Sequence, residues 1–158
     1  MSERSRQLPR RSCLSVPGSS PKMLAKAPGL GADMVFLDLE DSVAPLEKEA
    51  ARDNVVKAIN EQDWGDVVLC VRVNAWDTKW TYRDVIHVVE GAGERLDEIM
   101  LPKVQRASDV IALDMLLTQI EETTGRTNWV GIEPQIETAR GLINVEEICA
   151  ARWSPRSG

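Results

Sequence analysis

The chain has 158 residues, a formal net charge of −6 and a sequence pI near 4.9. A chain of this length can bury one hydrophobic core, so we expect one folded domain. The acidic balance, with no visible face rich in Lys and Arg, argues against nucleic acid as a partner, and no apolar run is long enough to span a bilayer, which argues against a membrane.

The first ten residues are basic, and no hydrophobic signal core follows them. We interpret residues 1–10 as a short disordered lead-in. The cysteines, Cys13, Cys70 and Cys149, are widely spaced and form no CxxC signature. Because all three lie in apolar strand-like or helix-like runs, we expect buried, reduced thiols in a cytoplasmic protein.

Strand-like and helix-like runs alternate along the rest of the chain. The first strand, 12–18, precedes a short helix over 20–31 with Ser20 as the candidate N-cap. The second strand, 33–39, precedes a helix over 45–60. One face of that helix carries Ala51, Val55, Ala58 and Ile59.

The third strand, 66–74, is apolar until Arg72, and a helix over 82–90 follows it. The fourth strand, 98–104, leads into the clearest helix, 108–125, with Ser108 as the candidate N-cap. One face of this helix carries Val110, Leu113, Leu117 and Ile120. A fifth strand, 128–137, and a helix over 138–151 complete the pattern.

Strands that are apolar on both faces and alternate with helices predict a parallel sheet covered by helices, which is the α/β class. Two architectures fit: an open doubly wound sheet, or a (β/α)8 TIM barrel of which this chain covers the first five β-α units. A full barrel takes about 250 residues. A doubly wound nucleotide-binding sheet is the weaker alternative, because no GxGxxG or GxxxxGK[ST] motif follows a strand.

Polar residues recur at the C-terminal end of each predicted strand. In chain order the strand ends carry Pro17, Gly18 and Ser19, then Asp38, Glu40 and Asp41, then Arg72 and Asn74, then Pro102 and Lys103, and finally Glu133, Gln135 and Glu137. In parallel α/β folds these strand ends share one rim, and sites are built there. We therefore expect the carboxylates to face a polar mouth together with Arg72 and Lys103.

The residue types at this rim indicate a site of mixed charge. Carboxylates without His or Cys neighbours suit a hard cation such as Mg²⁺. Arg72 and Lys103 suit anionic substrate groups, including a developing enolate oxygen. The one histidine, His87, lies in a helix-like stretch away from the rim, so we expect neither a histidine base nor a Ser-His-Asp triad.

Each rim residue also has a structural interpretation. The three acids after the second strand could cap the following helix, or pair with Lys48 and Arg52. Arg72 could form a structural ion pair, and Lys103 could be solvated. Glu137 could favour the positive end of a helix dipole, and Pro17-Gly18 could be a simple turn.

Five ordered segments together resemble a known family: RSCLSVPGSSPKMLAKA, DMVFLDLEDSVAPLEKEAAR, VLCVRVNAWDTKW, IMLPKV and IEPQIETARGLINVEEICAA. Over residues 11–151 the chain resembles the HpcH/HpaI aldolase and citrate lyase beta-subunit family. Within that family it is most similar to the CoA-ester lyases of the malyl-CoA and β-methylmalyl-CoA type. Five motifs in the right order are a strong signal.

The resemblance implies a (β/α)8 barrel that uses Mg²⁺ to cleave or form a carbon–carbon bond in a 3-hydroxyacyl-CoA. The partners would be an acyl-CoA and a small oxoacid such as glyoxylate. Glu137 matches the family's metal ligand, and Arg72 matches the Arg that steadies the enolate and oxoacid oxygens. Glu40 and Asp41 match the acids beside the metal and its waters. Four residues lie where relatives contact CoA: Arg11, Pro17, Gly18 and Lys103.

The end of the sequence departs from the family's pattern. Relatives continue with further strands that carry a second metal-ligand Asp and the acid/base group, whereas here residues 152–158 form a divergent tail. We therefore expect a truncated lyase, with residues 11–151 as a partial barrel that is inactive in this form and forms a homo-oligomer when full length. The alternative is a non-catalytic fragment that binds CoA or oxoacid, or that assembles with another chain.

Overall fold

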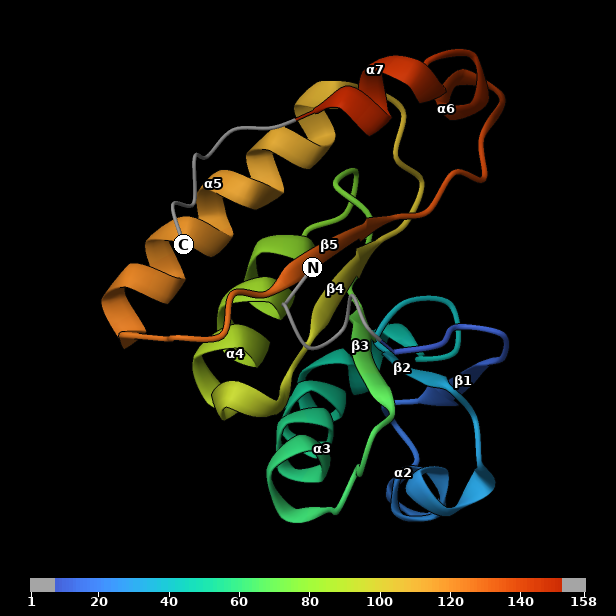
Figure 1. Ribbon diagram of the computed structural model, residues 1–158, viewed down its shortest axis with the longest axis vertical. Coiled ribbons are helices and arrows are strands. Elements are labelled where there is room, and N and C mark those ends of the chain that lie inside the picture. The colour runs from blue at the N-terminus through green and yellow to red at the C-terminus, as the bar shows by residue number, and fades with distance from the viewer. Residues whose placement is uncertain (1–7, 152–158) are drawn as a thin grey trace.

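The computed structural model describes residues 8–151, so the divergent tail and the first seven residues of the expected lead-in lie outside the described residues. Strands and helices alternate (Figure 1). The strands are β1 (Cys13–Pro17), β2 (Met34–Asp38), β3 (Val68–Arg72), β4 (Glu98–Leu101) and β5 (Gly131–Pro134). The helices are α2 (Pro21–Lys26), η1 (Ala27–Leu30), η2 (Pro45–Glu47), α3 (Lys48–Glu61), α4 (Thr81–Gly91), η3 (Gly93–Arg95), α5 (Ala107–Thr124), α6 (Ala139–Ile143) and α7 (Val145–Ala150).

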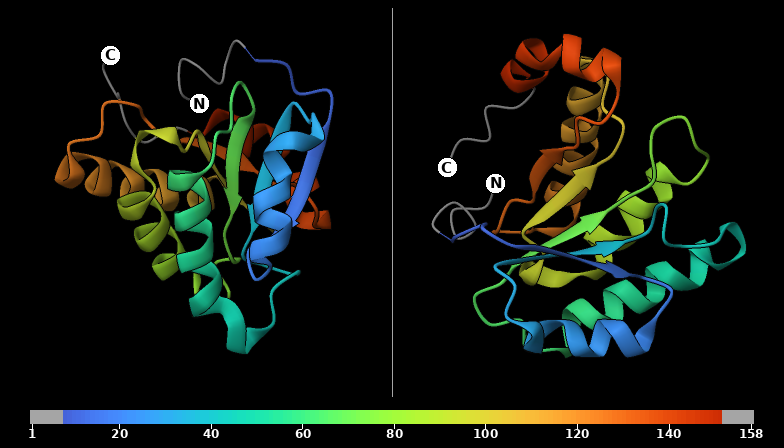
Figure 2. Two further views of the ribbon diagram at one scale, coloured as in Figure 1. Left: turned by 90° about the horizontal axis from the view of Figure 1, so that it is seen from below. Right: turned by 90° about the vertical axis from the view of Figure 1, so that its right-hand side faces the viewer.

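The five strands form one parallel sheet in the order β1-β2-β3-β4-β5. Parallel crossovers are right-handed, so a strand order without reversal places every connecting helix on the same face. Helices α2, α3, α4 and α5 accordingly lie side by side along one face of the sheet (Figures 1 and 2). A doubly wound sheet would reverse direction. The observed winding is that of a barrel wall, as the α/β prediction allowed.

Side chains alternate between the two faces of the sheet. Val35 and Leu37 of β2 point toward the helices and join the main core, as do Leu69 and Val71 of β3. The opposite, inner face holds a smaller apolar cluster of Met34, Val68, Cys70 and Met100. The inner face also receives Asp38 and Arg72, the last residues of β2 and β3.

The helices begin and end close to where the sequence indicated. Ser20 is confirmed as the N-cap of α2, with its side chain accepting from the Met23 N–H. Ser108 is wrong as the N-cap of α5, because that helix begins at Ala107 and the Asp109 carboxylate accepts the N–H groups of Gln105 and Arg106 instead. None of the helices within residues 8–151 is long and apolar enough to cross a membrane.

All three cysteines are free, but only Cys70 is buried. The expectation of burial is wrong for Cys13 and Cys149. Cys13 faces inward from β1, an edge strand, and Cys149 lies on a two-turn helix that buries Ile148 instead. An apolar local sequence therefore did not predict whether these two cysteines are buried.

Candidate active site at the strand ends

Strand register brings the first two site residues together. Asp38 and Arg72 are direct neighbours at the ends of β2 and β3, on the same face of the sheet. Arg72 donates to both carboxylate oxygens of Asp38, through Nε and Nη2 at 2.8 Å each. The Phe36 ring lies 5.1 Å from the Arg72 guanidinium carbon. The guanidinium is therefore fixed in one orientation at the rim.

Asp38 is fully buried, with 0% exposure, yet it is ionised. Burial raises the pKa of Asp38, but the hydrogen bonds from Arg72, Ser42 and the Glu40 N–H outweigh it and lower that pKa to about 2. The hydrogen bond to Asp38 in turn raises the pKa of Arg72. The structural interpretation, in which Arg72 forms an ion pair, is thus confirmed. The pair uses Nε and Nη2 of Arg72 and leaves Nη1 for a contact with a ligand.

Glu40 is the second buried acid, with 4% exposure. Its Oε1 accepts from the Lys103 Nζ at 2.7 Å, and its Oε2 lies 3.5 Å from the Arg72 Nε. Oε2 is buried and has no hydrogen-bond partner among residues 8–151. Burial raises the pKa of Glu40, and Lys103 opposes that rise. The exposed Asp41 carboxylate lies 3.8 Å from the Lys103 Nζ.

Lys103 connects these acids to Glu137. Its backbone has φ +54°, a left-handed conformation that is uncommon for a residue with a side chain. The Glu137 Oε1 accepts from the Lys103 N–H at 2.9 Å. Glu40 raises the pKa of Lys103, which is therefore an ammonium ion. One residue thus meets carboxylates from the ends of β2 and β5.

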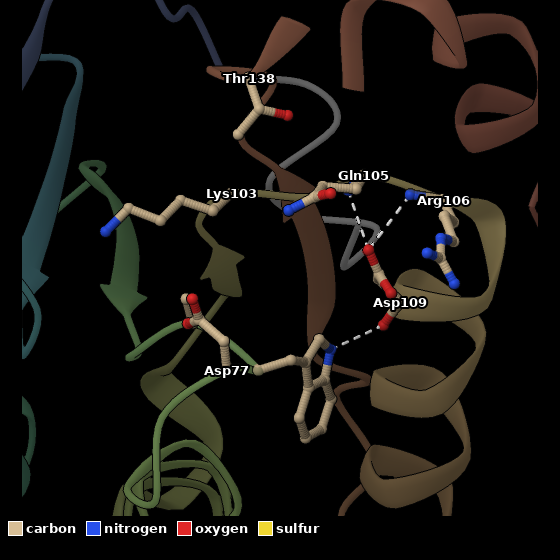
Figure 3. A pocket seen from close by; sticks show the side chains of 8 residues that line it. Asp77, Lys103, Gln105, Arg106, Asp109 and Thr138 are labelled. Carbon is tan, nitrogen blue, oxygen red and sulfur yellow. Dashed lines mark hydrogen bonds between the residues drawn. The ribbon is translucent and has the colours of Figure 1, made fainter. Parts of the chain in front are cut away.

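A cavity of about 250 Å³ opens beside this cluster. Figure 3 shows Lys103 on one side of it and Arg106 and Asp109 on the other, with the Lys103 ammonium extending away from them. Trp76 also lines the cavity. The Trp76 Nε1 donates to the Asp109 carbonyl at 3.0 Å and fixes the indole as a wall. The loops after β3, β4 and β5 all contribute to the lining.

The acids at the rim suit a hard cation by their chemistry, since all are carboxylates. Between residues 8 and 151, however, no group of three or more His, Cys, Asp or Glu side chains could hold a metal. Glu40, Asp41 and Glu137 each meet Lys103 instead. The Glu40 Oε2, which accepts no hydrogen bond among residues 8–151, and the exposed Glu137 fit part of a Mg²⁺ shell, and the described residues do not complete it.

The structure brings together Arg72, Glu40, Asp41, Lys103 and Glu137, as the strand-end rule predicted. It does not bring Arg11 to them. The Arg11 side chain is 81% exposed and pairs with Asp33. Both residues lie before the N-terminal ends of β1 and β2, at the end of the strands away from the rim.

Pro17 and Gly18 do lie at the rim, beside the end of β2. Gly18 is buried, and its N–H donates to the Asp38 carbonyl at 2.8 Å. A Cβ at this position would lie 2.9 Å from the same oxygen. Close packing of the two strand ends therefore explains this glycine without a ligand.

The alternative in which the rim acids pair with Lys48 and Arg52 is not what the structure has. Lys48 binds the backbone carbonyls of Leu39 and Glu40, and Arg52 pairs with Asp84. Sequence reasoning missed this buried network. A signal was present, because Lys48 and Arg52 flank Ala51 and Val55 on the apolar side of α3, where an unpaired charge would be costly.

A family model and curated relatives both match this chain. The family model described as HpcH/HpaI aldolase/citrate lyase matches residues 11–153. An L-malyl-CoA/beta-methylmalyl-CoA lyase of Cereibacter sphaeroides is 53% identical over 148 residues, which are 94% of this chain and 46% of that protein. A malyl-CoA/beta-methylmalyl-CoA/citramalyl-CoA lyase of Chloroflexus aurantiacus is 36% identical over 85% of this chain and 39% of its own. The chain spans about half the length of the curated relatives it matches.

Solved structures also resemble this chain. The CitE protein of Mycobacterium tuberculosis, in complex with magnesium, acetoacetate and coenzyme A, has a TM-score of 0.68 and 31% identity over 91% of this chain and 47% of its own. Malate synthase of Haloferax volcanii, in a pyruvate/acetyl-CoA ternary complex, has a TM-score of 0.81 at 22% identity over 95% of this chain and 45% of its own, which shows the fold alone. The predicted fold class, five β-α units of the TIM-barrel type, is confirmed.

Proposed function

Since the chain belongs to the HpcH/HpaI aldolase/citrate lyase family, we propose that it carries one part of the site of a Mg²⁺-dependent CoA-ester lyase. The substrate is a 3-hydroxyacyl-CoA of the malyl-CoA type, and the products are an acyl-CoA and an oxoacid such as glyoxylate. One observation carries the proposal: Arg72, Glu40, Lys103 and Glu137 converge at one rim from four different strand ends.

Arg72 is the group suited to the charge that develops in this reaction. Cleavage of the carbon–carbon bond leaves an enolate oxygen on the acyl-CoA, beside the carboxylate of the oxoacid. Asp38 holds two nitrogens of Arg72, while Nη1 has no partner within the described part of the chain. A fixed donor of this kind stabilises a developing oxyanion without reorganising during the reaction.

Glu137 is the carboxylate that would hold Mg²⁺, with Glu40 and Asp41 reached through water. The metal, when bound, polarises the carbonyl of the oxoacid as a Lewis acid. Lys103 keeps a positive charge beside Glu40 and Asp41 and provides contact for the anionic acyl-CoA. Pro17 and Gly18 provide further contact from the end of β1. Arg11 has no role in this proposal, because it lies at the N-terminal ends of the strands, away from the rim.

The test is cleavage of malyl-CoA with Mg²⁺, followed as glyoxylate release. We would assay the 158-residue chain and a fusion of residues 1–151 to the remaining half of the Cereibacter sphaeroides relative. The fusion should release glyoxylate, and Glu137→Gln should abolish the release. A folded fusion that binds Mg²⁺ and releases no glyoxylate would contradict the proposal.

The second candidate is a non-catalytic fragment that binds CoA or an oxoacid. The incomplete set of metal-ligating side chains among residues 8–151 favours it. Calorimetry of the 158-residue chain separates the two: this candidate requires heat on adding CoA or glyoxylate without Mg²⁺. It is contradicted if both titrations are flat while the fusion is active.

A further inference from the structure

Lys48 is a buried ammonium ion directly behind the rim. It is the first residue of α3 and only 5% exposed. Its Nζ donates to the Leu39 carbonyl, the Glu40 carbonyl and the Asn74 Oδ1, each at 2.7 Å. An ammonium has three N–H donors, so all of them are used.

The three acceptors belong to the two loops that carry the site. Leu39 and Glu40 directly follow β2, and Asn74 lies two residues after Arg72, the last residue of β3. The Asn74 Nδ2 also donates to the Leu39 carbonyl, at 2.9 Å. Lys48 thus joins the backbone that carries Glu40 to the loop that follows Arg72.

The junction is supported from α4. The Asp84 Oδ2 accepts from the Asn74 N–H at 3.0 Å and from its Nδ2 at 2.6 Å. The Asp84 Oδ1 accepts from the Arg52 Nε at 2.6 Å. The two cations of α3 and the carboxylate of α4 therefore form one buried network beneath the rim. All three Lys48 donors in it are bonded, whereas the Arg52 Nη2 is buried without a hydrogen-bond partner among residues 8–151.

We propose that Lys48 is a positioning residue, which sets the direction in which Glu40 and Arg72 face the substrate. The Lys48 Nζ lies 5.3 Å from the centre of the Trp80 ring as well. It acts on the rim through its three hydrogen bonds, to the backbone of residues 39 and 40 and to the side chain of Asn74. The inference rests on the proposed function for what Glu40 and Arg72 do, but the placement of the loop can be tested separately.

The competing interpretation is that Lys48 adds only to global stability, and Arg126 provides the matched control. Arg126 is also a buried cation, 8% exposed, that donates to backbone carbonyls, namely those of Gly93, Leu96 and Asn128. It follows α5 and binds the Leu96 carbonyl just before β4 begins, so it lies near the N-terminal strand ends, away from the rim. Both positions are compared as substitutions by methionine, which keeps a long apolar side chain.

Amide hydrogen exchange of the 158-residue chain is the first measurement. Lys48→Met should raise exchange at residues 39–43 by roughly tenfold or more, with smaller changes elsewhere in the sheet. Arg126→Met should leave residues 39–43 unchanged and raise exchange at 93–97. Lys48→Arg, which keeps a cation with several donors, should stay within about threefold of the parent at 39–43.

Kinetics on whichever protein cleaves malyl-CoA is the second measurement. Lys48→Met should lower kcat by roughly tenfold or more with KM within about twofold, because misplaced groups affect the transition state more than binding. Arg126→Met should change neither constant. If no protein turns over, the proposed function fails, and the exchange experiment still decides whether Lys48 places the loop.

The inference is overturned if Lys48→Met leaves exchange at 39–43 unchanged, or if Lys48→Met and Arg126→Met lower kcat equally. Should Lys48→Met not fold, Lys48→Arg decides. Protection retained at 39–43 then supports the inference, and exchange raised equally throughout the sheet contradicts it.

Discussion

Arg72 illustrates how much of this site depends on the orientation of one side chain. Two of its nitrogens bind Asp38, and the Phe36 ring lies beside the guanidinium. Lysine keeps the charge but loses the planar fork that both contacts require. In the lyase fusion, we expect Arg72→Lys to lower kcat/KM by roughly a hundredfold or more, measured as glyoxylate release. Arg83→Lys, at an exposed arginine of α4, is the control and should be near neutral. A loss of only a few-fold at Arg72 would argue against its role.

A second prediction concerns Asp38, the carboxylate that Arg72 binds. Its folded pKa of about 2 lies below the value of about 3.9 expected for the unfolded chain. The ionised form therefore stabilises the fold above about pH 4, and this contribution, of order 2 kcal/mol, is lost as the pH falls through 2. In urea titrations, Asp38→Asn should flatten the fall in unfolding free energy across that range. Asp66→Asn, at an exposed carboxylate, should keep it. An equally steep fall in Asp38→Asn would show that other groups carry the acid sensitivity.

The sequence predicted which residues lie at the rim better than it predicted their partners. Arg72, Lys103 and Glu137 were placed at the rim because they follow buried strands. That Arg72 pairs with Asp38 depends on the register between β2 and β3, across 34 residues of sequence. Pairing with the rim carboxylates was one alternative for Lys48, which binds two carbonyls and the Asn74 side chain instead. No sequence pattern states which backbone oxygens turn inward after a strand.

Helix α6 shows why the motif around Glu137 contains a glycine. A Cβ on Gly141 would lie 2.3 Å from the Val104 carbonyl oxygen, which follows β4. We expect Gly141→Ala to lower the unfolding free energy by about 1–3 kcal/mol, because backbone must shift to admit the methyl group. Gly29→Ala is the control: its Cβ would meet nothing within 4 Å among the described residues, so it should be neutral or stabilising by up to about 1 kcal/mol. Equal urea midpoints for the two variants would contradict the crowding.

At the scale of elements, composition and periodicity located each strand and the long helices. The apolar residues of the buried faces of α3 and α5 were predicted, but the buried Lys48, Arg52 and Glu121 on the same faces were not. The last helix was not, because residues 138–151 fold as two short helices that meet at Asn144. The Asn144 Nδ2 donates to the Gln105 carbonyl at 2.8 Å. That tertiary contact, from a loop 39 residues away, outweighs the local helical pattern.

For the molecule as a whole, the order of the strands decides the architecture. The sequence allowed a doubly wound sheet or a barrel wall, since both alternate strands and helices. Only the pairing, β1 through β5 without reversal, selects the second. Within the described chain, β1 and β5 are edge strands, and the inner face holds a cavity of about 610 Å³ next to Arg10, Glu98 and Glu133.

Those edges lead to a prediction about the 158-residue chain by itself. Edge strands present unpaired N–H and C=O groups that recruit other chains, and β1 and β5 carry no covering strand among residues 8–151. We expect the mass from light scattering to rise with concentration, and no cleavage of malyl-CoA. The fusion, which supplies the other half of the relative, should give one species. Ser15→Lys places a charge on exposed β1 and should reduce the association, whereas Ser108→Lys, exposed on α5, should not. A single monomeric species of the 158-residue chain that cleaves malyl-CoA would overturn both parts of the prediction, since neither the edges nor the incomplete carboxylate set would then matter.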